Sequence, residues 1–176
     1  MKDAILKQMQ NESRQTIIGV MGGGETDINQ YRLAYDLGKC IAKEGWVLLN
    51  GGRNSGVMDA SAKGAKENGG LTIGILPDTH ADQVSPWIDI PIITGMGIGR
   101  NAINVMSSHY VIACPGGTGT VSEIAMALKI NKKVVLLGWP GGKFFFQFGD
   151  IHYSDKPEQA IEYICECIRF KDRNRI

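Results

Sequence analysis

Short apolar segments alternate with amphipathic segments along most of the chain. The apolar segments predict β-strands at Thr16–Met21, Trp46–Leu49, Leu71–Leu76, Ile90–Ile93, His109–Cys114 and Lys133–Leu137. Helical spacing of apolar positions predicts helices at Asn29–Glu44, Gly56–Asn68, Arg100–Ser107, Thr120–Lys129 and Pro157–Phe170. Strands that alternate with helices in this way predict an α/β fold with a mostly parallel sheet.

Four of the predicted strands contain runs that are apolar throughout, namely VLL, TIGIL, VIAC and VVLL. Such runs are typical of strands that helices cover on both faces, so we expect a Rossmann-like three-layer sandwich. The chain has 176 residues, a length that suits one domain. We expect residues 15–172 to form that domain and residues 1–14 to be a polar N-terminal extension.

Composition and charge narrow the class of protein. The net charge is only +1, so we do not expect a nucleic-acid binder. No apolar run approaches the ~20 residues that span a bilayer, and Met1–Gln15 lacks a signal-peptide core. We therefore expect a cytoplasmic protein without membrane contact, in which the four cysteines are reduced. Neither the cysteines nor the three histidines have metal-ligand spacing, so no metal site is expected.

Glycine-rich segments follow four of the predicted strands. They are Gly22–Thr26, Asn50–Gly56, Thr94–Asn101 and Pro115–Thr120. Because ligands of open parallel sheets bind beyond the carboxyl ends of the strands, these segments are expected to form one binding edge.

The loop Pro115–Thr120 is the most informative of the four. Its glycines leave backbone N–H groups uncovered, and the following helix directs its free N–H groups and positive dipole end toward the loop. Thr118, Thr120 and Ser122 add hydroxyl donors. This combination predicts a site for a phosphate group. The alternative is a tight strand-to-helix turn with a threonine N-cap.

Two common nucleotide functions are disfavoured. Gly22-Gly23-Gly24 does not continue as GxGxxG, and Asn50 stands where a carboxylate would hold an NAD ribose. A Walker A lysine is also missing. Hydride transfer and ATP hydrolysis are therefore not expected.

Charged residues near the loops are candidates for ligand contacts. Arg100 begins a helix after a glycine-rich segment and can fork onto a phosphate or carboxylate, or be a surface arginine whose stem lies on the sheet edge. Glu123 stands one turn into its helix, as an acid/base group, a hydroxyl acceptor or simple helix support. Arg53 is a weaker phosphate candidate. Met58 and Asp59 are expected to be structural and capping, respectively.

These residues together resemble the LOG and molybdenum-cofactor carrier superfamily, formerly labelled lysine-decarboxylase-like. Pro115–Glu123 matches its signature PGGxGTxxE, Gly51–Met58 looks like its GGxxxGxM segment, and Arg100 falls where the family has an arginine. Three further segments look more like the short carrier branch: Ile18–Gly22, Asp89–Gly97 and Asn101–Asn104.

The resemblance implies two possible functions. Carriers are implied to bind the molybdenum cofactor, a pterin with a terminal phosphate, without turning it over. LOG enzymes are phosphoribohydrolases that cleave the N-glycosidic bond of nucleoside 5′-monophosphates with an arginine and the signature glutamate, which match Arg100 and Glu123. The LOG arginine lies in MHxRK, whereas Gly97–Asn101 reads GIGRN, so we favour the carrier. A module that senses a nucleotide is a third hypothesis.

The candidate site follows from the loops and the resemblance together. We expect a phosphorylated pterin or nucleotide as the ligand, with no required cofactor. Arg100 and Glu123 would be catalytic only in a hydrolase. The expected ligand-binding residues are Gly22, Gly23, Gly52, Arg53, Arg100, Pro115, Gly116, Gly117, Thr118, Gly119, Thr120 and Glu123.

Aromatic residues also suggest a homo-oligomer. Trp87, Trp139, Phe144–Phe146 and Phe148 give more apolar surface than one small domain is expected to cover. The alternative is that the phenylalanine run forms a buried edge strand or a lid on the core. The resemblance separately implies dimers or tetramers.

Overall fold

The structure is a computed structural model that describes residues 15–173, so the extension expected at residues 1–14 lies outside it. The strands are β1 (Ile17–Met21), β2 (Val47–Asn50), β3 (Thr72–Leu76), β4 (Ile90–Ile93), β5 (Tyr110–Ala113), β6 (Val134–Leu137) and β7 (Ile151–Ser154). The α-helices are α2 (Ile28–Lys43), α3 (Gly56–Glu67), α4 (Arg100–Ser107), α5 (Thr118–Lys129) and α6 (Pro157–Arg173). Two 3₁₀ helices, η1 (Gly97–Gly99) and η2 (Gly142–Phe148), precede α4 and β7.

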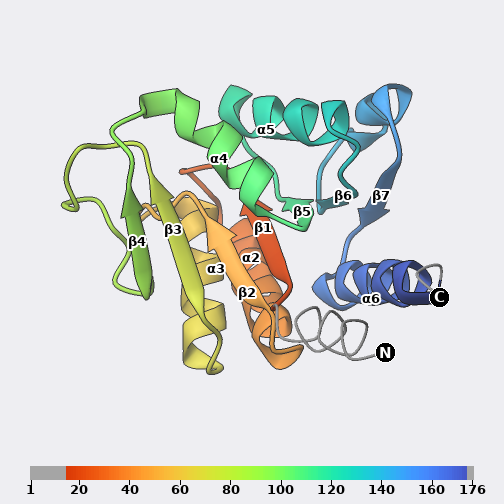
Figure 1. The fold of residues 1–176 in the computed structure, drawn as a ribbon, viewed down its shortest axis with the longest axis horizontal. Helices are drawn as coiled ribbons and strands as arrows, with labels where there is room; N and C mark the ends of the chain where they lie inside the picture. The colour runs from red at the N-terminus through yellow and green to blue at the C-terminus, as the bar shows by residue number, and fades with distance from the viewer. Residues whose placement is uncertain (1–14, 174–176) are drawn as a thin grey trace, which may run out of the picture.

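All strand pairs of the sheet are parallel, in the order β4-β3-β2-β1-β5-β6-β7 (Figure 1). The expected Rossmann-like α/β fold is thus confirmed. β1 lies in the centre, and the chain leaves it in one direction through β2, β3 and β4 and later in the other through β5, β6 and β7. The loops after β1 and β5 therefore diverge, which is the place where open α/β sheets bind ligands.

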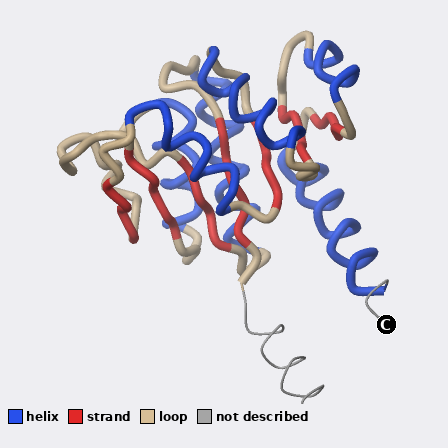
Figure 2. Tube along the Cα trace, turned by 45° about the horizontal axis from the view of Figure 1, so that its top comes forward, coloured by secondary structure: helices blue, strands red, loops and turns tan. Residues whose placement is uncertain are grey.

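Helices cover both faces of this sheet, as the view in Figure 2 shows. Alternate residues of a strand point to opposite faces. In β5, Ile112 packs into the core formed with α2, α3 and α6, whereas its neighbours Val111 and Ala113 pack into the core formed with α4 and α5. The helices whose first turns approach the loops thus come from both layers.

The closest helix packing is between α2 and α3, where two glycines allow the backbones to touch. A Cβ atom on Gly38 would lie 2.0 Å from the carbonyl oxygen of Ser61, and one on Gly64 would lie 1.9 Å from that of Tyr35. Both distances are far below van der Waals contact. This packing fixes α3, and with it the loop that precedes α3.

The structure differs from the prediction near the C-terminus. The phenylalanine run is the 3₁₀ helix η2 and not an edge strand, and only Phe145 is buried. The edge strand is β7, which the pattern did not reveal because IHYS is short and only Ser154 is fully buried. Trp139 packs edge-on against Phe145, with ring centroids 5.5 Å apart.

The opposite edge of the sheet is also open. All four residues of β4 are exposed, which separates it from the buried central strands. Within residues 15–173, no helix combines the length and apolar character needed to cross a membrane. The same residues contain no group of three or more His, Cys, Asp or Glu side chains that could hold a metal ion.

Candidate functional site

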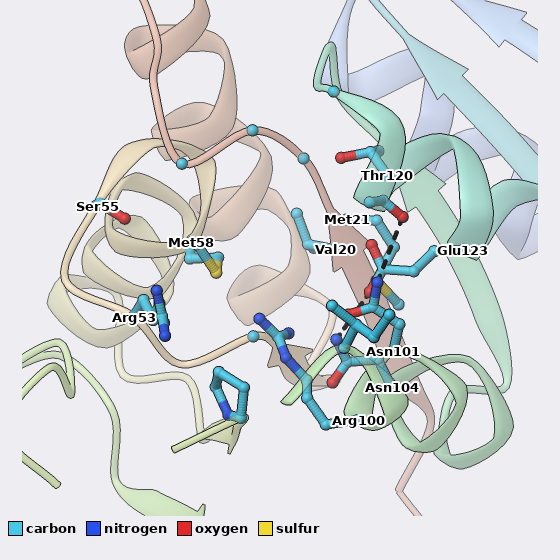
Figure 3. Close-up of a pocket in the computed structure, with 18 of the residues that line it drawn as sticks. Val20, Met21, Arg53, Ser55, Met58, Arg100, Asn101, Asn104, Thr120 and Glu123 are labelled. Carbon is cyan, nitrogen blue, oxygen red and sulfur yellow. Dashed lines mark hydrogen bonds between the residues drawn. The ribbon is translucent and has the colours of Figure 1, made fainter. Parts of the chain in front are cut away.

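A cleft of about 460 Å³ opens at the carboxyl edge of the sheet, at the point where β1 and β5 diverge. Its size falls in the range of ~300–1,000 Å³ usual for small-molecule sites. Figure 3 shows Arg53, Ser55 and Met58 on one side and Thr120 and Glu123 on the other, with Arg100 reaching between them. The residues that line it are Val20, Met21, Gly22, Gly23, Gly24, Gly51, Arg53, Ser55, Met58, Pro77, Asp78, Gly97, Ile98, Arg100, Asn101, Asn104, Gly117, Gly119, Thr120 and Glu123.

Backbone contacts between glycine-rich loops build the wall of the cleft. The N–H of Gly23 donates to the carbonyl oxygen of Pro115 at 3.0 Å, and the N–H of Val57 donates to that of Gly23 at 2.9 Å. Gly56 makes this approach possible, because it has a φ of +54° and a Cβ there would lie 2.2 Å from the oxygen of Gly23. One carbonyl group thus joins the loop after β1 to the first turn of α3.

Three helices begin at this cleft, and their first N–H groups have no side-chain cap. The N-cap residues are Ser55 of α3, Gly99 of α4 and Gly117 of α5, and none accepts a side-chain cap hydrogen bond. The first four N–H groups of an α-helix have no partner within the helix. Some of these N–H groups have backbone partners, since that of Val57 donates to Gly23 and that of Arg100 donates to Gly97 in η1. The other N–H groups and the helix dipoles give the cleft a positive lining that favours an anion.

The alternative of a threonine N-cap is therefore wrong for α5, because Gly117 occupies the cap position. Ser122, expected as a hydroxyl donor for the ligand, donates instead to the carbonyl oxygen of Gly119 at 2.6 Å. Asp59, expected as a cap, accepts from Ser85 Oγ at 2.7 Å and from the Tyr31 hydroxyl at 3.1 Å.

Arg53 and Asp78 form an ion pair on one wall of the cleft. Nη2 of Arg53 donates to both carboxylate oxygens of Asp78, at 2.8 and 2.9 Å. Nε of Arg53 is buried and has no partner. The positive charge of this arginine is thus largely committed to Asp78, while one of its donors stays free.

Arg100 extends from the first turn of α4 across the cleft to the loop after β2. A Cβ on Gly51 would lie 2.1 Å from Nη1 of Arg100, so the guanidinium group rests directly on this glycine. Burial lowers the pKa of Arg100 and the nearby charge of Arg53 adds to this, while Glu123 and Asp78 act in the opposite direction. Its Nε is buried and unpartnered.

Glu123 is buried at the floor of the cleft, only 6% exposed. Nδ2 of Asn104 donates to its Oε1 at 2.9 Å. Burial raises the pKa of Glu123, and the hydrogen bond from Asn104 and the charge of Arg100 lower it in part. The carboxyl group therefore holds its proton to a higher pH than a free glutamate, a property useful for proton transfer and tolerable beside an anion.

The acidic and basic side chains of the cleft balance one another. Arg53 and Arg100 face Asp78 and Glu123, which makes two formal charges of each sign. Attraction for an anion must then come mainly from the helix N-termini. A hydrogen bond to a charged group contributes about 1.5–3 kcal/mol, so several N–H groups suffice for firm binding.

Most of the residues expected from the sequence are brought together here. Eight line the cleft: Gly22, Gly23, Arg53, Arg100, Gly117, Gly119, Thr120 and Glu123. Pro115 and Gly116 line an adjoining cavity, which shares Gly23, Gly24 and Gly117 with the cleft. Gly52 faces Gly74 of β3 with a φ of +73° and does not line the cleft, and neither does Thr118.

Sequence reasoning missed several polar or polarisable side chains that line the cleft, among them Asp78, Asn104 and Met58. Asp78 directly follows β3 and Pro77, and the rule that strand carboxyl ends carry sites could have found it. Asn104 stands four residues after Arg100, a spacing that places both on one face of α4. Met58, expected to be structural, lines the cleft.

The fold and site define an α/β domain with a ligand cleft built from glycine loops and helix N-termini. A profile of the SLOG cluster4 family matches residues 15–161. The chain therefore belongs to the SLOG cluster4 family.

The chain is similar in sequence and structure to two proteins with solved structures, and similar in sequence to a third protein. The molybdenum cofactor binding protein of Rippkaea orientalis is 48% identical with a TM-score of 0.85, over 89% of this chain and 99% of that chain. The molybdenum cofactor carrier protein of Chlamydomonas reinhardtii is 45% identical with a TM-score of 0.83, over the same shares. A cytokinin riboside 5′-monophosphate phosphoribohydrolase of Mycobacterium tuberculosis is 29% identical over 136 residues, 73% of each chain.

Proposed function

We propose that this protein binds the molybdenum cofactor and carries it without turnover. The observation that supports this most is the distribution of buried side-chain polar atoms without a hydrogen-bond partner. Three such atoms occur in residues 15–173, Nε of Arg53, Nε of Arg100 and Oδ1 of Asn104, and all belong to residues that line the cleft. Each unsatisfied buried group costs about 1–3 kcal/mol, and a fold keeps such groups together where a ligand can satisfy them.

The residues present suit a phosphorylated pterin. The N–H groups at the start of α5, from Gly117 to Thr120, suit the terminal phosphate. Met21, Met58 and Ile98 supply apolar surface against which a flat ring system can pack. The similarity to two molybdenum-cofactor proteins at 45–48% identity favours this ligand over other phosphorylated heterocycles.

The proposal is tested by equilibrium dialysis with molybdopterin under anaerobic conditions. A Gly117→Asp variant adds a carboxylate at the anion position, and nothing lies within 4 Å of a Cβ there, so the fold is expected to tolerate it. Ala125→Asp is the matched control, because it adds the same charge to an exposed position on α5. Saturable binding by the wild type and the control, lost in Gly117→Asp, supports the proposal. A wild type that binds neither molybdopterin nor AMP refutes it.

Phosphoribohydrolase activity is the second candidate, because Arg100 and Glu123 line the same cleft and burial raises the pKa of Glu123. A carboxyl group that keeps its proton can protonate a leaving base. The assay is release of ribose 5-phosphate from AMP and from a cytokinin nucleotide. Equal background rates for the wild type and Glu123→Gln would exclude this activity.

We also propose that the protein works in the cytoplasm as a homo-oligomer. A reducing compartment would keep free the four cysteines, which form no disulfide in the structure. Phe144, Phe146 and Phe148 of η2 are 62%, 44% and 58% exposed, a cluster that a second copy of the chain could cover. Light scattering tests this directly. A monomer at all concentrations would remove the oligomer from the proposal.

A further inference from the structure

Two of the three unpartnered atoms in the cleft belong to one helix, α4, and have complementary hydrogen-bonding roles. Nε of Arg100 is a donor and Oδ1 of Asn104 is an acceptor. The two residues are four apart on α4, so their side chains leave the helix on the same face, and both line the cleft. Asn104 itself is fully buried, with an exposed fraction of 0%.

The orientation of the Asn104 amide follows from its neighbour. The oxygens of the Glu123 carboxyl group accept hydrogen bonds, so the amide nitrogen of Asn104 faces Glu123, as the 2.9 Å contact shows. Oδ1 is then turned away from Glu123 and is left without a donor. Glu123 thus fixes Asn104 in the orientation that presents an acceptor.

The orientation of Arg100 leaves its Nε donor in a similar position. The end of its guanidinium group rests on Gly51, while its charge acts on Glu123 and Asp78 without an ion pair within 4 Å to either. Turning this side chain toward a ligand breaks no hydrogen bond that the structure shows. Nε of Arg100 and Oδ1 of Asn104 are both buried, so a ligand in the cleft reaches them through such a movement of the Arg100 side chain.

From these contacts we infer that Arg100 and Asn104 form a second subsite, which recognises an uncharged group that accepts and donates hydrogen bonds at the same time. The inference rests on the proposed function and deepens it. The helix N-termini bind the phosphate, and Arg100 and Asn104 (the α4 pair) form hydrogen bonds with the part of the ligand that is attached to the phosphate. A second anion would satisfy Arg100 but would face the lone acceptor of Asn104 and the carboxyl group of Glu123, so the subsite rejects it. Two ligand groups have the required chemistry: the ring lactam shared by pterins and guanine, and a sugar hydroxyl.

A ladder of three probes separates these sources. Inorganic phosphate tests the anion subsite alone, ribose 5-phosphate adds hydroxyl groups, and GMP adds a lactam. Calorimetry is expected to show that the affinity rises about tenfold in at least one step, either from phosphate to ribose 5-phosphate or from ribose 5-phosphate to GMP. A gain of this size is what two newly satisfied buried hydrogen-bonding atoms can supply. The step between phosphate and ribose 5-phosphate would identify hydroxyl recognition, and the step from there to GMP would identify the lactam.

Two variants assign the step to the pair. Arg100→Lys keeps the positive charge but removes the trigonal Nε donor, and Asn104→Leu keeps the volume but removes the acceptor. Both are expected to abolish the same step while the affinity for inorganic phosphate stays within about twofold, since that subsite is built from backbone groups. Met106→Ala is the control for substitution on α4, because Met106 is 72% exposed and does not line the cleft.

The outcomes separate this inference from the proposed function. A step that persists unchanged in both variants, or a wild type with no step at all, overturns the subsite. If molybdopterin still binds in that case, the carrier function stands and only the α4 pair is misassigned. If the wild type binds none of molybdopterin, phosphate, ribose 5-phosphate and GMP, the carrier function itself is overturned.

Discussion

At the scale of single residues, the cleft depends on places where a side chain is absent as much as on those present. The missing side chain of Gly51 leaves space for the guanidinium group of Arg100, and that of Gly56 leaves space for the carbonyl oxygen of Gly23. The sequence pointed to the glycine loops and to Arg100 and Glu123, because strand ends and signature spacing are visible in it. The spacing places Asn104 on the same face of α4 as Arg100, but nothing in a linear sequence shows that its amide meets a carboxylate on α5.

Gly51→Ala is expected to weaken ligand binding about tenfold without unfolding the protein, the size of one or two lost charge-assisted hydrogen bonds. The new Cβ would lie 2.1 Å from Nη1 of Arg100 and 2.6 Å from Sδ of Met58, so both side chains must move. Molybdopterin affinity by dialysis and thermal melting measure the two effects. Gly99→Ala is the control, since its Cβ would meet only ordinary contacts, 3.6 Å or more to Met96. Unchanged affinity in Gly51→Ala would show that the position of Arg100 does not matter for binding.

Glu123→Gln is expected to stabilise the protein at neutral pH. Burial raises the pKa of Glu123 above that of the unfolded chain, so its contribution to stability is fully present below the unfolded pKa and is lost as the pH rises through the folded pKa. Glutamine keeps an acceptor for Asn104 and cannot ionise. The melting temperature of the variant should exceed that of the wild type by a few degrees near pH 7, and the gap should close near pH 4. A gap that widens in acid would mean that burial does not dominate the titration.

At the scale of elements, hydrophobic periodicity predicted six of the seven strands and all five α-helices found in residues 15–173, because central parallel strands and amphipathic helices carry strong patterns. It failed for β7, which is short and carries the polar residues His152 and Ser154. It also failed for η2, whose conformation depends on tertiary contacts such as that of Trp139 with Phe145. Pattern also could not show that α2 and α3 touch through their backbones. That contact needs glycines at Gly38 and Gly64, which read in sequence merely as weak helix formers.

Gly64→Ala tests this contact, because the contact decides whether the substitution raises or lowers the free energy of unfolding. In an ordinary helix the change gains about 0.5–1 kcal/mol, because alanine is the better helix former. Here the added methyl group would lie 1.9 Å from the carbonyl oxygen of Tyr35, so we expect a loss of about 1–3 kcal/mol from overpacking. Chemical denaturation measures it, with Arg32→Ala on the exposed face of α2 as the control. A stabilised Gly64→Ala would show that the two helices can separate freely.

At the scale of the whole molecule, the cleft joins the two layers of helices. α3 comes from one face of the sheet and α4 and α5 from the other, and their first turns meet where β1 and β5 diverge (Figure 1). The fold thus places the N-termini of three helices around one volume, and the sheet between the layers holds them in position. α4 and α5 pack on each other directly, so a bound anion should add a link between this pair and α3, which lies on the opposite face of the sheet.

Ligand binding is accordingly expected to raise the melting temperature and to slow hydrogen exchange at both sides of the cleft. At a ligand concentration of 100 times Kd, linkage gives about 2.7 kcal/mol of stabilisation, or roughly 5–10 °C for a domain of this size. Slower exchange should appear at Gly22, Gly24 and Gly117–Thr120, residues that line the cleft or begin α5. β7 and α6 lie at the far edge of the sheet and should show only the change that follows from global stability. Protection confined to β7 and α6 would place the ligand outside the cleft, because an anion held at the helix N-termini must cover the groups that hold it.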